Sequence, residues 1–176
     1  ILDSVFGPGG YTPVPEQQSQ TWPGGEVEVT ILASHTAADW NLGFCRICDG
    51  SDLALLTQLV LFGTQAYDLG PVNNVVWVNA AILVAPQIVG TVHSANALNP
   101  TGSNHLMAFS VTGQANTFVL AFEDWLFDVN PASDGDFNDL VVQVRYNPIP
   151  EPSTLLLTGG AVLALFAARR RRRPRA

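Results

Sequence analysis

The sequence of 176 residues contains no lysine, and basic residues of any kind are scarce in its first 147 positions. Only Arg46 and Arg145 lie there, whereas the other six of the eight basic residues lie between positions 169 and 175. Fourteen of the fifteen acidic residues lie in residues 1–147, so the formal charge of this body is 2 − 14 = −12. Such a surface repels nucleic acid and anionic lipid and attracts cations. We therefore expect no nucleic-acid partner; the alternative interpretation is an acidic surface that only keeps the protein soluble.

Catalytic motifs are missing as well. The sequence has no G-x-S-x-G elbow, no glycine-rich phosphate loop and no closely spaced histidine pair. Its three histidines, His35, His93 and His105, are isolated, and we expect them in loops or on the surface. These absences indicate that the protein is not an enzyme, and a secreted hydrolase is the least favoured function.

The C-terminal 29 residues differ from the body in composition. Residues 155–168 read LLLTGGAVLALFAA and are followed by the arginine cluster 169–175. A helix of this length spans about 21 Å, which is short for a bilayer core that takes about 20 apolar residues. Residues 153–154 and snorkelling arginine side chains lengthen the span. We predict a single transmembrane helix over about 153–168.

The arginine cluster decides between this helix and the alternative, a helix buried in a core. Consecutive arginines cannot enter a core, and by the positive-inside rule they stay cytoplasmic. The five that would stop the membrane anchor are Arg169, Arg170, Arg171, Arg172 and Arg173. The acidic body then lies on the outer side of the membrane.

Pro150, Glu151 and Pro152 lie just before the apolar run, and the two prolines keep this backbone extended and unpaired. A PEP triplet, a short apolar helix and a terminal arginine cluster, in this order, resemble the PEP-CTERM sorting signal of Gram-negative bacteria that make exopolysaccharide. The resemblance covers residues 148–176. It implies recognition by an exosortase, removal of the helix, and export to the cell envelope, surface or biofilm matrix. The first residues lack the segments of a signal peptide, so we expect one to have been removed.

The body contains seven short apolar runs separated by Gly, Pro and Asn, starting near positions 26, 41, 53, 74, 105, 116 and 139. In EVEVTILAS, Val27, Val29 and Ile31 alternate with polar residues. The sixth run places positions 118, 120 and 122 on one face, and the seventh does the same for 140, 142 and 144. The run at 53–63 is too apolar for a half-exposed strand, so it also permits a helical turn.

This pattern predicts an all-β protein, an antiparallel β-sandwich of the jelly-roll or Greek-key kind, over residues 26–147. Residues 1–25 are rich in Pro and Gly and predict an arm or linker. Such an arm would be able to pair as a strand with a neighbouring subunit.

The segment 123–139 is the most acidic part of the body. Its six carboxylates are Glu123, Asp124, Asp128, Asp134, Asp136 and Asp139. Like charges repel unless water or a cation relieves them, and Ca²⁺ takes hard oxygen ligands of this kind. In an extended segment Asp134, Asp136 and Asn138 would point to one side, and a loop that folds back would bring them to Glu123. The spacing is not that of an EF-hand; a solvated acidic loop is the alternative.

The stretch FEDW…D…DGDFNDLVV is similar to the FED…D-x-D-[YF]-N-D-L-V-V hallmark of a bacterial extracellular domain family of unassigned function, often found with PEP-CTERM tails. WNLGFCRICDG is similar to that family's N-x-L-G-[FY] segment, with the cysteines as a departure. The resemblance implies a β-rich domain with a calcium site. The ligands it implies are Glu123, Asp124, Asp136, Asn138 and Asp139, with Asp134 and Asp128 as weaker matches.

Cysteine occurs only as Cys45 and Cys48, a single C-x-x-C. The pair permits a disulfide, two free thiols, half of a zinc site or a redox pair. A redox pair needs a helix N-terminus, whereas this stretch is typical of strand and turn, and a zinc site needs two further ligands. A local disulfide fits an exported protein best, so we predict that Cys45 and Cys48 are joined.

Together these patterns predict an exported, surface- or matrix-associated structural or adhesive protein that binds Ca²⁺ and is sorted by an exosortase. The alternative is a calcium-dependent carbohydrate-binding module for exopolysaccharide. Trp125, beside the acidic segment, is the aromatic residue that this alternative would use.

Overall fold

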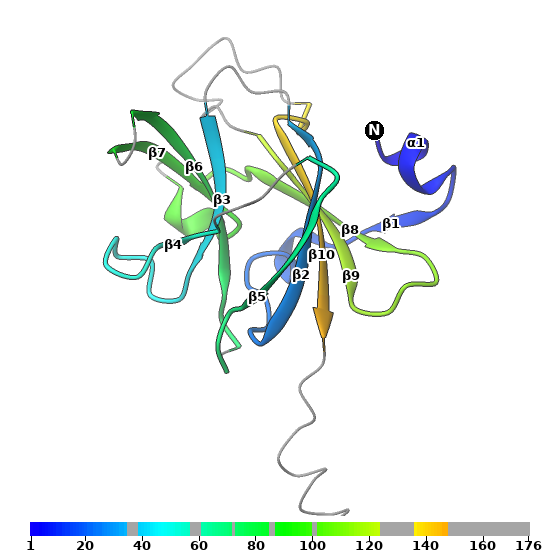
Figure 1. Cartoon of the computed structure of the whole chain (residues 1–176), viewed down its shortest axis with the longest axis horizontal. Coiled ribbons are helices and arrows are strands. Elements are labelled where there is room, and N and C mark those ends of the chain that lie inside the picture. The colour runs from blue at the N-terminus through cyan, green and yellow to red at the C-terminus, as the bar shows by residue number, and fades with distance from the viewer. Residues whose placement is uncertain are drawn as a thin grey trace, which may run out of the picture.

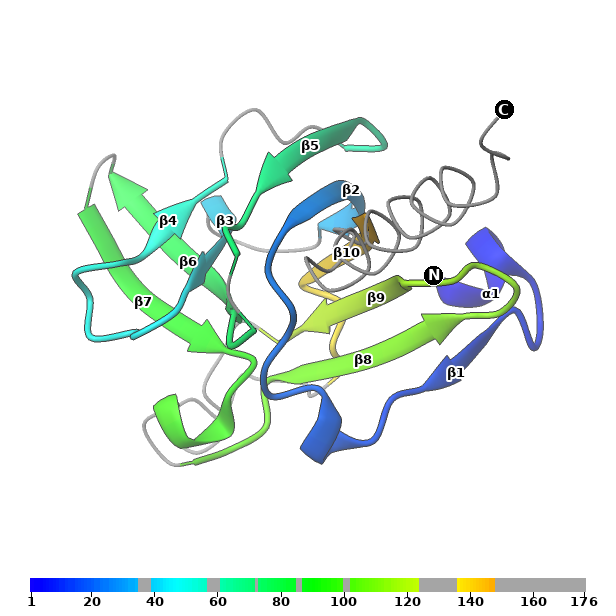
Figure 2. The same cartoon turned by 90° about the horizontal axis from the view of Figure 1, so that it is seen from below.

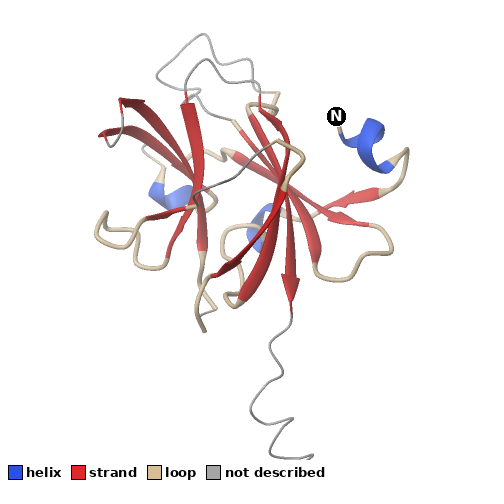
Figure 3. Cartoon of the chain, in the orientation of Figure 1, coloured by secondary structure: helices blue, strands red, loops and turns tan. Residues whose placement is uncertain are grey.

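Two antiparallel β-sheets make up the body of the protein (Figures 1 and 3). The computed structural model describes residues 1–34, 39–56, 61–71, 73–84, 87–99, 102–123 and 136–147. The larger sheet has the order β1-β8-β9-β10-β2-β5, and the smaller has the order β4-β3-β6-β7. The predicted all-β, antiparallel class is therefore confirmed.

The larger sheet consists of β1 (Tyr11–Pro13), β2 (Glu26–Ser34), β5 (Thr64–Asp68), β8 (Leu106–Val111), β9 (Thr117–Phe122) and β10 (Leu140–Asn147). The smaller sheet consists of β3 (Asp39–Cys45), β4 (Ala54–Leu55), β6 (Val76–Val84) and β7 (Gln87–His93). The helices of the described residues are short: α1 (Leu2–Phe6), η1 (Glu16–Gln18) and η2 (Asn96–Leu98). The order β8-β9-β10 is a meander, which the predicted jelly-roll or Greek-key connectivity did not specify.

The two sheets share one apolar core, because alternate residues of facing strands point between them. The faces predicted for the last two runs are confirmed. Leu120, Phe122, Leu140, Val142 and Val144 are all buried in this core. The smaller sheet contributes Leu42 and Trp77 to the same core.

A second apolar cluster lies on the outer face of the larger sheet. Val119, Ala121 and Val141, which alternate with core residues along β9 and β10, are buried there. Leu2 and Phe6 of α1 pack against this cluster, and so do Phe109 and Phe137. The larger sheet is therefore apolar on both faces in this region.

Residues 1–25 contact both sheets. β1 pairs with β8 at the edge of the larger sheet, with Tyr11 opposite Val111 (Figure 2). Trp22 is 4 % exposed and forms a bridge with Val75. The Gln20 carbonyl accepts a hydrogen bond of 3.0 Å from Ser94 Oγ. These contacts place the segment within the packed body, whereas its Pro and Gly content predicted an arm or linker.

The predicted tail lies outside the described residues: the PEP triplet, the apolar run 153–168 and the arginine cluster. Within the part of the chain that is described, no helix has the length and apolar character needed to cross a membrane.

Candidate functional site

In the larger sheet, β9 ends at the level where β8 and β10 begin. The predicted metal-binding residues lie at this level. Leu106, Phe122 and Leu140 lie opposite one another on β8, β9 and β10. One position further along each strand, the register therefore places His105, Glu123 and Asp139 side by side. The backbone N–H of Glu123 donates to the His105 carbonyl oxygen at 3.1 Å, which extends the β8–β9 ladder to this level.

Glu123 is buried at the end of β9, with an exposed fraction of 1 %. Its Oε2 accepts a hydrogen bond of 3.3 Å from the backbone N–H of Phe137. A buried carboxylate is costly unless it is hydrogen-bonded or paired, so this contact is part of what makes its position tolerable. The end of β9 and the segment before β10 thus meet, as expected from a loop that folds back.

Asp136 and Asn138 form a local turn on either side of Phe137. Asp136 Oδ1 accepts a hydrogen bond of 3.2 Å from the Asn138 backbone N–H, and the Asn138 side-chain amide donates to Asp136 Oδ2. The φ angle of Phe137 is +54°, in the left-handed region. The two side chains therefore meet through a turn, and not through the extended backbone on which the prediction relied.

Of the remaining predicted ligands, the structure describes only Asp139. Asp124, Asp128 and Asp134 lie outside the described residues, as does Trp125. Asp139 directly follows the turn and precedes β10. Among the residues with described positions, no three His, Cys, Asp or Glu side chains converge closely enough to hold a metal ion.

Both arginines of the body make their contacts elsewhere. Arg46 Nη2 donates to the Leu69 carbonyl oxygen at 3.1 Å, and its guanidinium lies 5.7 Å from the centre of the Phe44 ring. Arg145 Nη1 lies 3.7 Å from Glu28 Oε2. Arg145 is five residues away from Leu140, the first residue of β10. These two side chains are thus committed to other parts of the sheets.

A hollow of about 260 Å³ opens on the outer face of the larger sheet beside the turn. β8, β9 and β10 contribute Met107, Phe109, Ala121 and Val141 to its lining, and the N-terminal segment contributes Ile1 and Leu2. The rest of its lining is Asp136, Phe137 and Asn138. The turn that carries two predicted ligands therefore also borders an apolar recess.

Sequence reasoning missed the position of the histidines. His105 was expected in a loop or on the surface: it does lie outside the strands, directly before β8, but it is completely buried beside Glu123. His93 is half-buried in β7, where burial lowers the pKa of its imidazole. The available signal was the place of His105 directly before an apolar run, which extends that strand's pairing by one residue. His35 lies outside the described residues.

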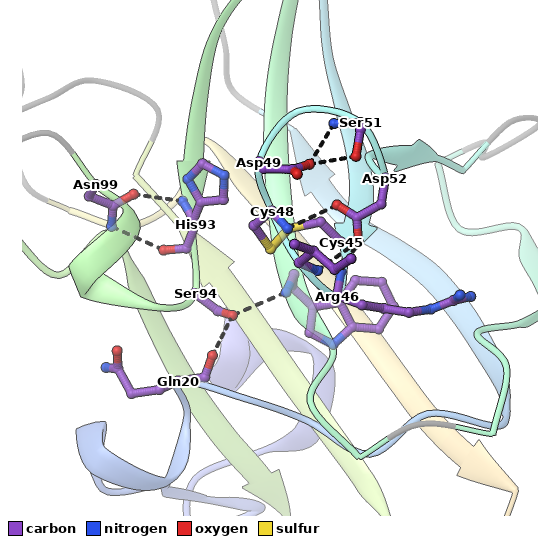
Figure 4. Close-up of a disulfide and its surroundings, with 12 residues drawn as sticks. Gln20, Cys45, Arg46, Cys48, Asp49, Ser51, Asp52, His93, Ser94 and Asn99 are labelled. Atoms are coloured by element: carbon purple, nitrogen blue, oxygen red, sulfur yellow. Dashed lines mark hydrogen bonds between the residues drawn. A yellow bond between two sulfur atoms is a disulfide. The ribbon is translucent and has the colours of Figure 1, made fainter.

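The predicted disulfide between Cys45 and Cys48 is confirmed (Figure 4). The loop that it closes is organised by the Asp52 carboxylate. Oδ2 accepts the backbone N–H groups of Ile47 at 2.7 Å and Arg46 at 2.6 Å, and Oδ1 accepts that of Cys48 at 2.9 Å. These hydrogen bonds hold the pKa of Asp52 below its usual value. The loop follows strand β3, so it lacks the helix N-terminus of a redox pair.

Two family models match the chain. Residues 71–147 match a family described as Domain of unknown function (DUF4114), and residues 148–172 match the PEP-CTERM protein-sorting motif. The chain is therefore similar to DUF4114 domains over residues 71–147 and ends in a PEP-CTERM sorting motif. No curated protein matches the chain.

The DUF4114 match covers β6 to β10 and includes Glu123, Asp136, Asn138 and Asp139. It does not cover β2 and β3, although β2 pairs with β10 and β3 pairs with β6. Those pairings make residues before position 71 part of the same two sheets.

The PEP-CTERM motif establishes the destination of the protein. Such motifs are recognised by an exosortase and direct export through the membrane to the cell envelope or surface. The match includes Pro150, Glu151 and Pro152 and reaches into the arginine cluster. The chain is therefore sorted as an exported exosortase substrate.

Proposed function

We propose that the body of the protein, residues 1–147, is a non-catalytic, calcium-binding structural or adhesive module of the cell surface or biofilm matrix. Glu123, Asp136, Asn138 and Asp139 would hold the ion, with Asp124 and Asp134 as further ligands from the intervening segment. The observation that carries this proposal is the buried Glu123 carboxylate, which contacts the backbone between Asp136 and Asn138. Two oxygen-rich groups separated in sequence thus lie next to each other, as a Ca²⁺ site requires.

The charge balance supports the same proposal. The body has a formal charge of −12, and six carboxylates lie between positions 123 and 139. Its two arginines are bound to Leu69 and Glu28. A divalent cation would offset the repulsion within the segment and stabilise the junction between β9 and β10.

We predict that Ca²⁺ raises the melting temperature, because an ion that binds only the folded state stabilises it by mass action. At a free concentration of 100 times Kd the gain is about 2.7 kcal/mol. Differential scanning calorimetry of the full chain, with Ca²⁺ titrated against a chelator, measures this gain. Asp136→Asn should remove most of it.

Glu26→Gln is the matched control for Asp136→Asn. It also removes one carboxylate, but Glu26 is exposed and lies opposite Asn147, at the other end of the β2–β10 pair from Asp139. We expect this variant to respond to Ca²⁺ like the parent. A full response in Asp136→Asn as well would show that the ion binds elsewhere or that only general charge screening is at work.

A calcium-dependent carbohydrate-binding module for exopolysaccharide is the second candidate function. The observation that favours it is the hollow, which places the aromatic ring of Phe137 next to two proposed ligands. A metal with an open coordination position would favour this second function, whereas a closed site would favour the structural role.

A further inference from the structure

The hollow on the outer face has the composition of a small-ligand site. Seven of its nine lining residues are apolar or aromatic, and the other two are Asp136 and Asn138. Sites for small molecules typically combine a mainly apolar lining with a few polar groups that fix the orientation of the ligand. Met107, on its lining, is 40 % exposed, so this recess is open to solvent.

We propose that this hollow binds one neutral sugar unit of an extracellular polysaccharide. The inference rests on the carbohydrate binding of the second function proposed above, not on its calcium dependence, and assigns it a place and a ligand class. A pyranose ring has apolar C–H faces and a rim of hydroxyl groups. The rings of Phe109 and Phe137 and the Met107 side chain match the faces. The Asp136 carboxylate accepts hydrogen bonds from hydroxyls, and the Asn138 amide both donates and accepts them.

Size and charge argue for this occupant over others. A volume of about 260 Å³ lies below the range of about 300–1,000 Å³ that holds drug-sized ligands, so it suits a single monosaccharide unit. Acyl chains carry no group that uses Asp136 and Asn138. Uronic acids and fatty acids would bring a negative charge to Asp136 on a body of charge −12.

Phe137 links the hollow to the proposed cation site. Its φ of +54° lies in the left-handed region, which is uncommon for a residue with a Cβ. In this conformation the residue lines the hollow while its backbone N–H donates to Glu123. The backbone therefore serves the buried carboxylate and the side chain serves the recess, so the two roles are separable by mutation.

The experiment uses the fact that the chain has a single methionine, Met107. In the full chain labelled with [methyl-¹³C]methionine, one NMR signal reports directly on the hollow. Glucose, galactose, mannose and N-acetylglucosamine are titrated at millimolar concentrations, with glucuronate and octanoate as anionic comparators. We expect a saturable shift with at least one neutral sugar and none with the comparators.

Phe137→Gly tests the assignment without disturbing the backbone, because glycine adopts a positive φ freely. It should weaken sugar binding at least about tenfold and leave the Ca²⁺-induced rise in melting temperature in place. Phe62→Gly is the matched control: Phe62 also has a positive φ, +58°, but it is 69 % exposed and lies just before β5. Ala121→Leu fills the hollow from β9 and should act like Phe137→Gly.

The outcomes separate this inference from the calcium proposal. A Met107 signal that no neutral sugar moves, or that octanoate moves alone, overturns the sugar site even if Ca²⁺ raises the melting temperature. A sugar-dependent shift lost in Phe137→Gly but kept in Phe62→Gly supports the site even if Ca²⁺ has no effect. A shift that survives in both Phe137→Gly and Ala121→Leu shows binding elsewhere and overturns the assignment.

Discussion

Asn79 is the residue whose environment contradicts its chemistry most clearly. It lies in the middle of β6 and is completely buried, opposite Leu42 of β3 and Val92 of β7. Neither its Oδ1 nor its Nδ2 has a hydrogen-bond partner in the described part of the structure. A buried amide without partners loses its hydrogen bonds to water and gains none in return, at a cost of about 1–3 kcal/mol.

A leucine side chain has nearly the same shape as that of asparagine but no polar atoms. We therefore predict that Asn79→Leu raises the free energy of unfolding by about 1–3 kcal/mol. Thermal denaturation should show an increase of about 2–4 °C for each kcal/mol. The matched control is Asn99→Leu. Asn99 is 4 % exposed, but its side chain bonds to the His93 N–H and carbonyl and to the Ser103 carbonyl. This variant should be less stable than the parent; a loss of stability in Asn79→Leu would contradict the argument.

A buried side-chain hydrogen bond joins elements of the two sheets across the core. Trp77 Nε1 of β6 donates to Tyr146 Oη of β10 at 2.9 Å. Trp22 stacks on Tyr146 with an interplanar angle of 1°, which adds the N-terminal segment to the same junction. Burial raises the pKa of Tyr146 well above its usual value.

This burial predicts how stability depends on alkaline pH. The folded state keeps Tyr146 neutral, whereas the unfolded chain ionises it near pH 10, so its contribution is complete below about pH 10 and is lost as the pH rises further. Tyr146→Phe lacks this titration but leaves Trp77 Nε1 without its partner, which costs about 1–3 kcal/mol. The difference in melting temperature between parent and variant should thus be constant at neutral pH and narrow above about pH 10. A constant difference up to pH 11 would show that Tyr146 reaches solvent.

The sequence did not predict β1, β5 and β7 as strands. β5 reads TQAYD, β1 contains Pro13, and β7 contains Gly90, so none of them has a strong pattern of its own. They are strands because β2, β8 and β6 offer them free edges to pair with. The run at 53–63, by contrast, is mainly apolar, yet β4 takes up only two of those of its residues that the structure describes.

The whole molecule combines an acidic body with a sorting motif that determines its location. Recognition at Pro150-Glu151-Pro152 is the step that commits the chain to the envelope or surface. A body of charge −12 at that surface attracts divalent cations, which links the place of the protein to the function proposed for it.

We predict that Glu151→Ala blocks processing, because the exosortase reads the PEP triplet. Immunoblotting of cell fractions should find the full-length variant in the membrane fraction, whereas the parent appears as a shorter product at the surface. Glu26→Ala, which removes a carboxylate from the body, is the control and should be processed normally. Processing of both variants at the parental rate would show that this glutamate is not read.

The sequence by itself determined the features that depend on residues close together in the chain. These are the sorting motif, the inward faces of β2, β9 and β10, and the Cys45–Cys48 disulfide. Only the tertiary structure decided which distant residues meet. It buried Trp22 in the core, paired His105 with Glu123, and set the turn at Phe137 against the outer face of the sheet. The physical reason is that periodicity and local hydrogen bonding depend on residues close together in the chain. Burial, by contrast, depends on strands that are far apart in the sequence and pair with one another.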